Sequence, residues 1–290
     1  MEIKKVGVVG CGLMGSGIAE VCARSGYSVI VREVNEELLQ KGLARIQKSL
    51  TTAAAKGKIT QEEATQAWAR IHGTMSLADF SGCDLVVEAA VENMSLKKEI
   101  FAELDGMLAP HAILASNTSS LCVTEMASAT GRGDKVLGIH FFNPVPVMPL
   151  IEFVRTILTS DDTMAAARQF GASLGKTMVT AKDTPGFIVN RLLIPYVLDA
   201  VRVYEEGLAT REDIDTAIKL GLNHPMGPFE MADLVGLDVR LAILEHLHAT
   251  LGETFRPANL LRQYVQAGRL GRKTGRGVYE YDDEGHKLEP

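Results

Sequence analysis

Short apolar runs alternate with amphipathic helical patterns from Lys5 to Thr180. The apolar runs are rich in β-branched residues and predict buried strands at Lys5–Val9, Ser28–Val31, Leu85–Ala90, Ile113–Ala115, Val136–Ile139 and Lys176–Thr180. Helical periodicity lies between them, for example over residues 96–108 and 163–174. Alternation of this kind predicts an α/β fold built on a doubly wound, mostly parallel sheet.

The pattern changes at Thr184-Pro185-Gly186, beyond which the periodicity is only helical. One broad apolar face is expected on the first of these helices, formed by Ile188, Leu192, Leu193, Tyr196, Val197 and Ala200. Further helices are predicted over residues 211–220, 238–251 and 259–267. We therefore predict two domains, an α/β domain over residues 1–184 and an all-helical domain over 185–290. So short a helical bundle is expected to complete its core against a second subunit, which predicts a homodimer.

A helical hairpin is predicted as an insertion over residues 35–70. Its first helix carries an apolar stripe made by Leu39, Leu43, Ile46, Leu50 and Ala53 or Ala54. The opposite face is basic, with Arg45, Lys48 and Lys56, and Lys58 follows just beyond. A solvated surface explains such a face. A landing site for a polyanion, such as the phosphates of coenzyme A, is the more specific alternative, although the spacing alone favours the solvated surface.

A glycine motif, Gly10-Cys11-Gly12-Leu13-Met14-Gly15, joins the first predicted strand to a helix. In the dinucleotide-binding (Rossmann-type) unit, the first glycine allows a tight turn, the second lets the backbone approach a pyrophosphate, and the third permits close helix–strand packing. The N-terminus of the helix then receives the phosphates. A purely structural βαβ unit is the alternative, but strand, turn, helix, strand and a following acidic residue are all present. We expect the cofactor NAD here.

The acidic residue after the second strand is Glu33, 18 positions beyond Gly15. A carboxylate at this place accepts hydrogen bonds from ribose hydroxyls and repels a 2′-phosphate, which favours NAD over NADP. Arg32 beside it points the other way, because a nearby arginine is how a 2′-phosphate is accommodated.

Polar residues follow the remaining predicted strands at their C-terminal ends. Glu92 follows one strand, with Lys97 in the first turn of the next helix, and the run Ser116-Asn117-Thr118-Ser119-Ser120 follows another. In open parallel sheets ligands bind outside these strand ends, so Glu92 and Lys97 are candidate cofactor neighbours. Ordinary helix-start charge and helix capping are the alternative explanations.

The stretch Val136 to Glu152 reads VLGIHFFNPVPVMPLIE. A buried strand delivers His140 at its C-terminal end, and three prolines exclude a helix from the segment that leads to Glu152. Such a detour can fold the carboxylate back onto the imidazole, giving a general base whose tautomer is fixed. A hydrogen-bonded core histidine and a solvated glutamate are the competing interpretation.

Composition narrows the function classes. A net charge of −6 argues against nonspecific nucleic-acid or membrane-surface binding, and no apolar run approaches the length of about 20 residues that a membrane span needs. Four scattered cysteines without CxxC spacing indicate a reducing compartment, so we expect a cytoplasmic protein without a leader peptide. His246 and His248 are two positions apart on a helix and make a poor metal site, so no metal is expected.

Six motifs together resemble the L-3-hydroxyacyl-CoA dehydrogenase family, and in particular its short bacterial 3-hydroxybutyryl-CoA dehydrogenases. They are GCGLMG, VVEAAVEN, ASNTSSL, HFFNPVPVMPLIE, TPGFIVNRLL and NHPMGPFEMADLVGLD, and they span essentially the whole chain. The resemblance implies NAD-linked, reversible interconversion of (3S)-3-hydroxyacyl-CoA and 3-oxoacyl-CoA in a dimer with an all-helical C-terminal domain.

The resemblance also implies residue roles. His140 is the expected catalytic acid/base and Glu152 its partner, while Ser119 contacts the substrate oxygen and Asn190 completes the polar cluster. The residues expected to bind the cofactor are Gly10, Gly12, Leu13, Met14, Gly15, Glu33, Glu92, Lys97, Asn117 and Asn143. On the helical insertion only Lys56 is expected to contact coenzyme A.

Two departures from the family pattern are visible. Pro149 stands where relatives commonly have lysine, which puts the path between His140 and Glu152 in question, and Glu33 replaces a usual aspartate. Two other functions remain as alternatives, a dehydrogenase of a free hydroxy acid or sugar acid on the same scaffold, and a non-catalytic NAD-binding protein.

Overall fold

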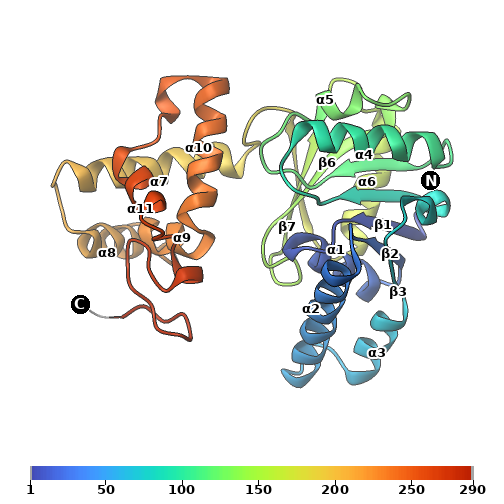
Figure 1. The fold of residues 1–290 in the computed structure, drawn as a ribbon, viewed down its shortest axis with the longest axis horizontal. Helices are drawn as coiled ribbons and strands as arrows, with labels where there is room; N and C mark the ends of the chain where they lie inside the picture. The colour runs from blue at the N-terminus through green and yellow to red at the C-terminus, as the bar shows by residue number, and fades with distance from the viewer. Residues whose placement is uncertain (1, 289–290) are drawn as a thin grey trace. The chain divides into compact units, whose positions relative to one another are not determined.

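The computed structural model describes residues 2–288, and the chain divides into two compact units, residues 1–187 and 188–290. The division lies three positions beyond the predicted domain boundary at 184/185. Each unit has its own hydrophobic core and is described by itself (Figure 1).

The first unit is built on one sheet of eight strands in the order β3-β2-β1-β4-β5-β6-β7-β8. The strands are β1 (Lys5–Val9), β2 (Ser28–Arg32), β3 (Ile71–Thr74), β4 (Leu85–Glu88), β5 (Ile113–Ser116), β6 (Val136–Phe141), β7 (Leu150–Arg155) and β8 (Thr177–Lys182). The first six strands are parallel to one another. The predicted doubly wound sheet is therefore confirmed.

Helices cover both faces of this sheet, with α4 and α5 above it and α1 and α2 below it in Figure 1. The helices are α1 (Leu13–Arg24), α2 (Glu36–Ala55), α3 (Gln61–Ala69), α4 (Met94–Met107), α5 (Val123–Ala127) and α6 (Asp161–Ser173), with short 3₁₀ turns at Leu77–Gly82 and Gly133–Lys135. Successive strand residues face opposite layers, as the period of two requires: Val8 packs into the α1–α2 layer and Val9 into the α4–α5 layer.

Local sequence signals start several of these helices. Asn35 caps α2 by accepting from the Leu38 amide, and Thr60 forms a reciprocal capping box with Glu63 at the start of α3. The predicted helical hairpin is confirmed, and its stripe packs inward through Leu39, Ile46 and Leu50.

The strand β7 is the main departure from the predicted alternation. It pairs antiparallel with β6, and β8 pairs parallel with β7, so the last two strands run against the first six. The reason is the short proline-containing connection over residues 142–149, which is too short for a helical crossover. The strand β3 was also not predicted, because IHGT is a short run without strong alternation.

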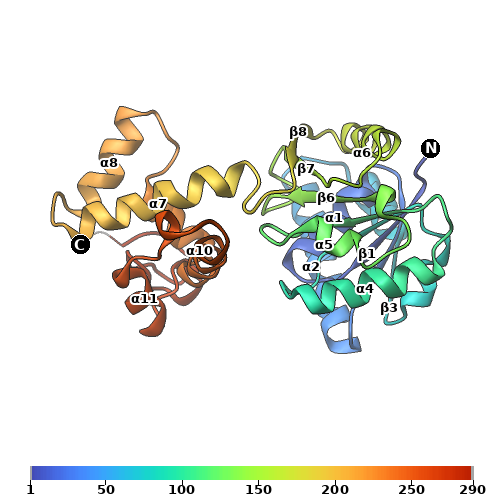
Figure 2. The same cartoon turned by 90° about the horizontal axis from the view of Figure 1, so that it is seen from above.

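Over residues 188–288 the regular elements of the second unit are all helices, arranged around the long helix α7 (Figure 2). They are α7 (Val189–Glu205), α8 (Arg211–Gly221), α9 (Pro228–Val235), α10 (Leu237–Leu251) and α11 (Asn259–Gln266), with 3₁₀ turns at Glu253–Phe255 and Arg272–Thr274. The all-helical prediction is confirmed, but the predicted face of α7 is partly wrong. Ile194, Leu198 and Val201 are buried, whereas Leu192 is 70% exposed.

No helix among residues 2–288 is long and apolar enough to cross a lipid bilayer.

Candidate active site

His140 and Glu152 face each other directly across the antiparallel strands β6 and β7. His140 Nδ1 lies 2.7 Å from Glu152 Oε2, and both side chains are buried. Cross-strand partners in register project to the same face of a sheet, so the hairpin itself holds this pair. Since the carboxylate accepts the Nδ1 proton, the imidazole presents Nε2 as its basic nitrogen.

Lys176 binds the turn between these strands. Its Nζ donates to the carbonyls of Val145 and Met148, each at 2.7 Å, and burial lowers the pKa of Lys176. Pro149 sits at the end of the turn, where its carbonyl accepts from the Thr177 amide at 2.7 Å. Proline lacks an N–H, but Pro149 lies outside the residues that pair between β6 and β7. The proline that replaces the family's usual lysine therefore leaves the His140–Glu152 pair intact.

Aromatic rings and Asn117 complete the surroundings of His140. The rings of Phe142 and Phe187 lie with centroids 4.5 and 5.8 Å from the imidazole. Asn117, at the end of β5, accepts from the Phe141 amide through Oδ1 at 2.9 Å, which orients its side-chain NH₂ group. The ends of β5 and β6 are thereby joined next to the imidazole.

Glu92 organises the loop that carries Ser119. Its Oε1 accepts from Thr118 Oγ1 at 2.8 Å, from the Ser119 amide at 2.9 Å and from Ser119 Oγ at 3.4 Å. The Glu92 side chain is 43% exposed, so its carboxylate can both fix this loop and reach a ligand outside the strand ends.

Lys97 is buried beneath that loop and is paired with two carboxylates. Its Nζ lies 2.6 Å from Glu88 Oε1 and 3.2 Å from Glu92 Oε2, and it also donates to the Ala90 carbonyl at 3.4 Å. The three acceptors match the three donors of the ammonium group. A direct contact of Lys97 with the cofactor stays a prediction, and the contacts seen here are internal.

Glu88 was missed in the sequence analysis because it lies within the apolar run that predicts the strand Leu85–Ala90. It is fully buried, and its Oε2 accepts from Ser116 Oγ at 2.6 Å. Ser116 Oγ in turn accepts from the Thr118 amide at 3.1 Å. A carboxylate inside the run LVVEAA is the one signal that could have identified it, because a buried charge needs a partner.

The glycine motif has the geometry that a dinucleotide requires. Gly10 has φ +96°, and a Cβ there would lie 2.7 Å from the Ala89 carbonyl oxygen. A Cβ on Gly15 would lie 1.8 Å from the Gly10 carbonyl oxygen, so helix and strand pack as closely as the motif predicts. A Cβ on Gly12 would meet no atom within 4 Å, which leaves open space at the N-terminus of α1 for a pyrophosphate. The residues present therefore fit NAD.

Glu33 lies against this loop. Its Oε1 accepts from the Cys11 amide at 2.7 Å and its Oε2 from the Val34 amide at 3.0 Å, which leaves lone pairs for ribose hydroxyls. Arg32 donates through Nε to the Met75 carbonyl at 3.3 Å. The carboxylate, and not the guanidinium, is thus the group bound to the glycine loop.

The other predicted contacts are surface positions. Leu13 is exposed at the start of α1 with Met14 half-buried behind it, Asn143 is exposed in the β6–β7 turn, and Lys56 is exposed at the C-terminal end of α2. Asn190 belongs to α7 of the second unit. Its place beside His140 stays a prediction.

Comparisons with known proteins agree over almost the whole chain. Residues 5–184 match the family model for the 3-hydroxyacyl-CoA dehydrogenase NAD binding domain, and residues 186–281 match that for the C-terminal domain. A 3-hydroxybutyryl-CoA dehydrogenase of Bradyrhizobium diazoefficiens is 48% identical over 280 residues, which is 96% of each chain.

Two solved structures are similar to this chain. FadB2 of Mycobacterium tuberculosis has a TM-score of 0.95 at 48% identity, with 97% of this chain and 100% of that chain covered. (S)-3-hydroxybutyryl-CoA dehydrogenase PaaH1 of Ralstonia eutropha has a TM-score of 0.93 at 47% identity with the same coverage.

Proposed function

Since the chain belongs to the 3-hydroxyacyl-CoA dehydrogenase family, we propose that it catalyses the NAD-dependent, reversible oxidation of (3S)-3-hydroxybutyryl-CoA to acetoacetyl-CoA. The observation that carries this proposal is the buried His140–Glu152 pair at the C-terminal end of β6. It lies in the sheet whose β1 leads into the glycine motif.

In the oxidation, His140 Nε2 accepts the proton of the 3-hydroxyl group as the carbonyl forms. Glu152 holds the Nδ1 proton and stabilises the imidazolium that results, from a position without access to water. Bound NAD supplies the acceptor for the hydride that leaves C3. In the reduction, the imidazolium returns its proton to the forming alkoxide.

We propose that the substrate oxygen is held by Ser119 and Asn190, acting where charge develops. The three contacts from the Ser119 loop to Glu92 support the first assignment, because they fix the loop before substrate arrives. The Asn190 assignment is supported by the family motif GFIVNR in this sequence.

The proposal is tested with His140→Gln, assayed with acetoacetyl-CoA and NADH. We expect kcat to fall about 10²–10⁴-fold, the range for loss of a positioned acid/base group, with the NADH affinity unchanged. His111→Gln is the matched control, because His111 precedes the N-terminal end of β5, whereas His140 lies near the C-terminal end of the parallel strand β6. A His140→Gln enzyme with near-normal kcat contradicts the mechanism.

We also propose that the protein is a homodimer formed by the second unit. Nine large apolar side chains among the described residues of that unit are more than a third exposed, namely Ile188, Leu192, Leu208, Leu220, Leu222, Leu234, Val235, Val239 and Leu288. Burial of such surface favours association. Sedimentation velocity at assay concentrations should give twice the mass of one chain, and a monomer there would count against the dimer.

The four free thiols support a reducing, cytoplasmic setting.

A further inference from the structure

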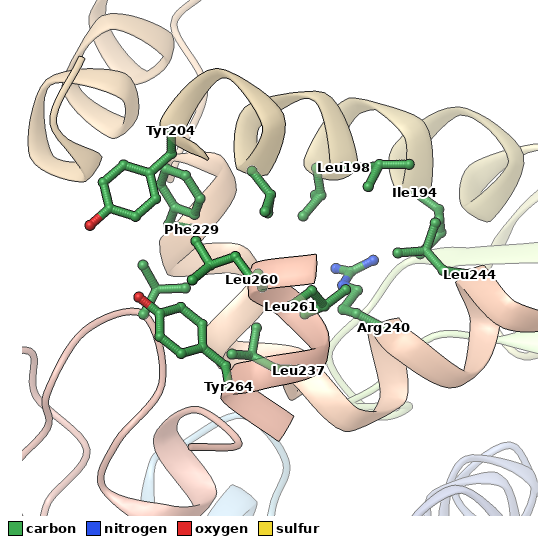
Figure 3. Close-up of a pocket in the computed structure, with 14 residues that line it drawn as sticks. Ile194, Leu198, Tyr204, Phe229, Leu237, Arg240, Leu244, Leu260, Leu261 and Tyr264 are labelled. Atoms are coloured by element: carbon green, nitrogen blue, oxygen red, sulfur yellow. The ribbon is translucent and has the colours of Figure 1, made fainter. Parts of the chain in front are cut away.

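The hydrophobic core of the second unit encloses a cavity of about 20 Å³ (Figure 3). Leu198, Leu244 and Leu261 are among the side chains that face it. With an apolar wall, this cavity cannot hold a polar ligand and belongs to the packing of that core. A polar contact that the proposed mechanism does not use lies in the first unit, at the glycine motif.

Arg45 binds the glycine motif from the inserted helix α2. Its Nη1 donates to the Cys11 carbonyl at 3.2 Å. Gly42 lies three positions earlier on the same face of α2, and a Cβ there would come 2.5 Å from the Cys11 carbonyl oxygen. This close approach of α2 to the glycine motif brings the Arg45 side chain within reach of Cys11.

The contact with Arg45 sets the orientation of the peptide bond between Cys11 and Gly12. This bond is trans, and in a planar trans peptide the C=O and N–H groups point in opposite directions. Because the Cys11 C=O points to α2, the Gly12 N–H points away from it. Among residues 2–288 the Gly12 N–H has no hydrogen-bond acceptor, and a Cβ on Gly12 would meet no atom within 4 Å. The free donor therefore lies beside the open space where the pyrophosphate of NAD is expected.

No other contact described above holds this peptide. Glu33 Oε1 accepts from the Cys11 amide at 2.7 Å, but that amide belongs to the preceding peptide bond, between Gly10 and Cys11. Gly12 has no Cβ to restrict its φ, so the Cys11–Gly12 peptide could turn about its neighbouring bonds if the carbonyl were released. The direction of the Gly12 N–H therefore depends on Arg45.

We propose that Arg45 is a positioning residue for the cofactor. By holding the Cys11 carbonyl, it keeps the Gly12 N–H directed at the pyrophosphate of bound NAD. The inference rests on the NAD-binding part of the proposed function and not on the acyl substrate. It is therefore tested by cofactor binding alone, which stays measurable whichever substrate the enzyme uses.

The first measurement is fluorescence titration of Arg45→Met with NADH in the absence of substrate. Kd should rise about three- to tenfold, the range for loss of one correctly placed hydrogen bond. Arg70→Met is the matched control, because Arg70 Nη1 donates to the Ala23 carbonyl at 3.3 Å, near the C-terminal end of α1. It removes an arginine–carbonyl hydrogen bond of the same kind away from the glycine motif and should keep the wild-type Kd. An unchanged Kd in Arg45→Met overturns the proposal.

Two further binding measurements separate positioning from other roles of Arg45. Adenosine lacks the pyrophosphate, so it should compete with NADH through the same Kd in wild type and Arg45→Met. The loss of NADH affinity should persist at high salt, where a direct contact between charges is screened. Equal losses for adenosine and NADH would make Arg45 a structural residue, and a loss that vanishes at high salt would make it a direct phosphate contact. Either result overturns the proposal.

The wild-type protein alone also decides the question, should Arg45→Met fail to fold. In crystals of its NADH complex, the Gly12 nitrogen should lie within hydrogen-bond distance of a pyrophosphate oxygen, with Arg45 still on the Cys11 carbonyl. A Gly12 N–H that points away from the pyrophosphate contradicts the proposal. So does an Arg45 guanidinium that has left Cys11 for a phosphate.

Discussion

The carboxylate of Glu152 is effective because it is close to His140 and shielded from water. Its side chain has no exposed surface, and the charge on a protonated imidazole 2.7 Å away is little screened there. The hydrogen bond between Nδ1 and Glu152 also orients the ring. One buried glutamate thus sets both the tautomer and the orientation of the base.

A second buried pair, Glu88 and Lys97, leads to a prediction at the Ser119 loop. Glu88→Gln leaves the Lys97 ammonium without its nearest counter-charge, which should cost about 3–5 kcal/mol of stability. Because Lys97 also holds Glu92, the loop should loosen and kcat should fall about ten- to hundredfold. Tm and kcat with acetoacetyl-CoA measure the two effects.

The double variant Glu88→Gln/Lys97→Met separates the two effects. It removes both charges from the interior, so Tm should return close to the wild-type value. The loss of kcat should remain, because Glu92 has still lost Lys97. If the double variant recovers full activity together with its stability, the pair is structural only.

Lys97 also shows a limit of sequence analysis for single side chains. A lysine in the first turn of a helix predicts an exposed charge or a ligand contact, whereas this one is almost completely buried. Its burial depends on Glu88, which comes from a different element nine positions earlier. Pairs of this kind are decided by tertiary contact, which no local pattern contains.

Among the elements, the glycine loop was foreseen in detail because each glycine has a local cause. The strand β7 was not, although its residues LIEFVR are apolar enough to be a strand. Whether a strand returns antiparallel or crosses over depends on the connection, and the proline-rich turn excluded a helix without specifying a hairpin. The support of that turn by Lys176 is likewise a contact between distant elements.

The glycine loop gives a prediction with a built-in control. In Gly12→Ala the new Cβ meets open space in the protein alone. The free energy of unfolding should therefore stay within about 0.5 kcal/mol of the wild-type value. The methyl group occupies the space proposed for the pyrophosphate, so the Kd for NADH should rise at least tenfold. Fluorescence titration with NADH measures this.

Gly15→Ala should behave in the opposite way. Its Cβ would lie 1.8 Å from the Gly10 carbonyl oxygen, so β1 and α1 must separate and Tm should fall clearly. If Gly12→Ala lowers Tm as much as Gly15→Ala does, then Gly12 is needed for packing within the protein and not to leave space for a ligand.

For the whole molecule, composition and alternation were enough to predict an α/β unit followed by a helical one. This succeeded because the change of periodicity at Thr184-Pro185-Gly186 is abrupt and the apolar runs of the first unit are separated by helical patterns. Neither pattern contains information on how a residue of the second unit is related to His140 in the first unit. For that reason the role of Asn190 rests on its family motif.

Overall charge leads to the last prediction. The molecule carries a net charge of −6, so a polyanionic coenzyme A ester needs local cations to offset the repulsion. Lys48 and Lys56 are exposed on the inserted helix α2, while Arg45 is already bound to the Cys11 carbonyl at 3.2 Å. Lys48→Gln/Lys56→Gln should raise KM for acetoacetyl-CoA about three- to thirtyfold, as expected for two exposed charge contacts, and leave kcat unchanged.

Two controls make this test specific. Lys4→Gln/Lys135→Gln changes the net charge equally, but these lysines precede the N-terminal ends of β1 and β6, whereas the candidate site lies at the C-terminal strand ends, so this variant should leave KM unchanged. An acetoacetyl thioester of N-acetylcysteamine lacks the nucleotide, so the α2 variant should use it as well as the wild type does. Raising the salt concentration should shrink the difference between wild type and variant, because exposed charges are screened. If KM for acetoacetyl-CoA does not respond to the α2 lysines, the basic face is only a solvated surface, and an enzyme acting on a free hydroxy acid becomes the better description.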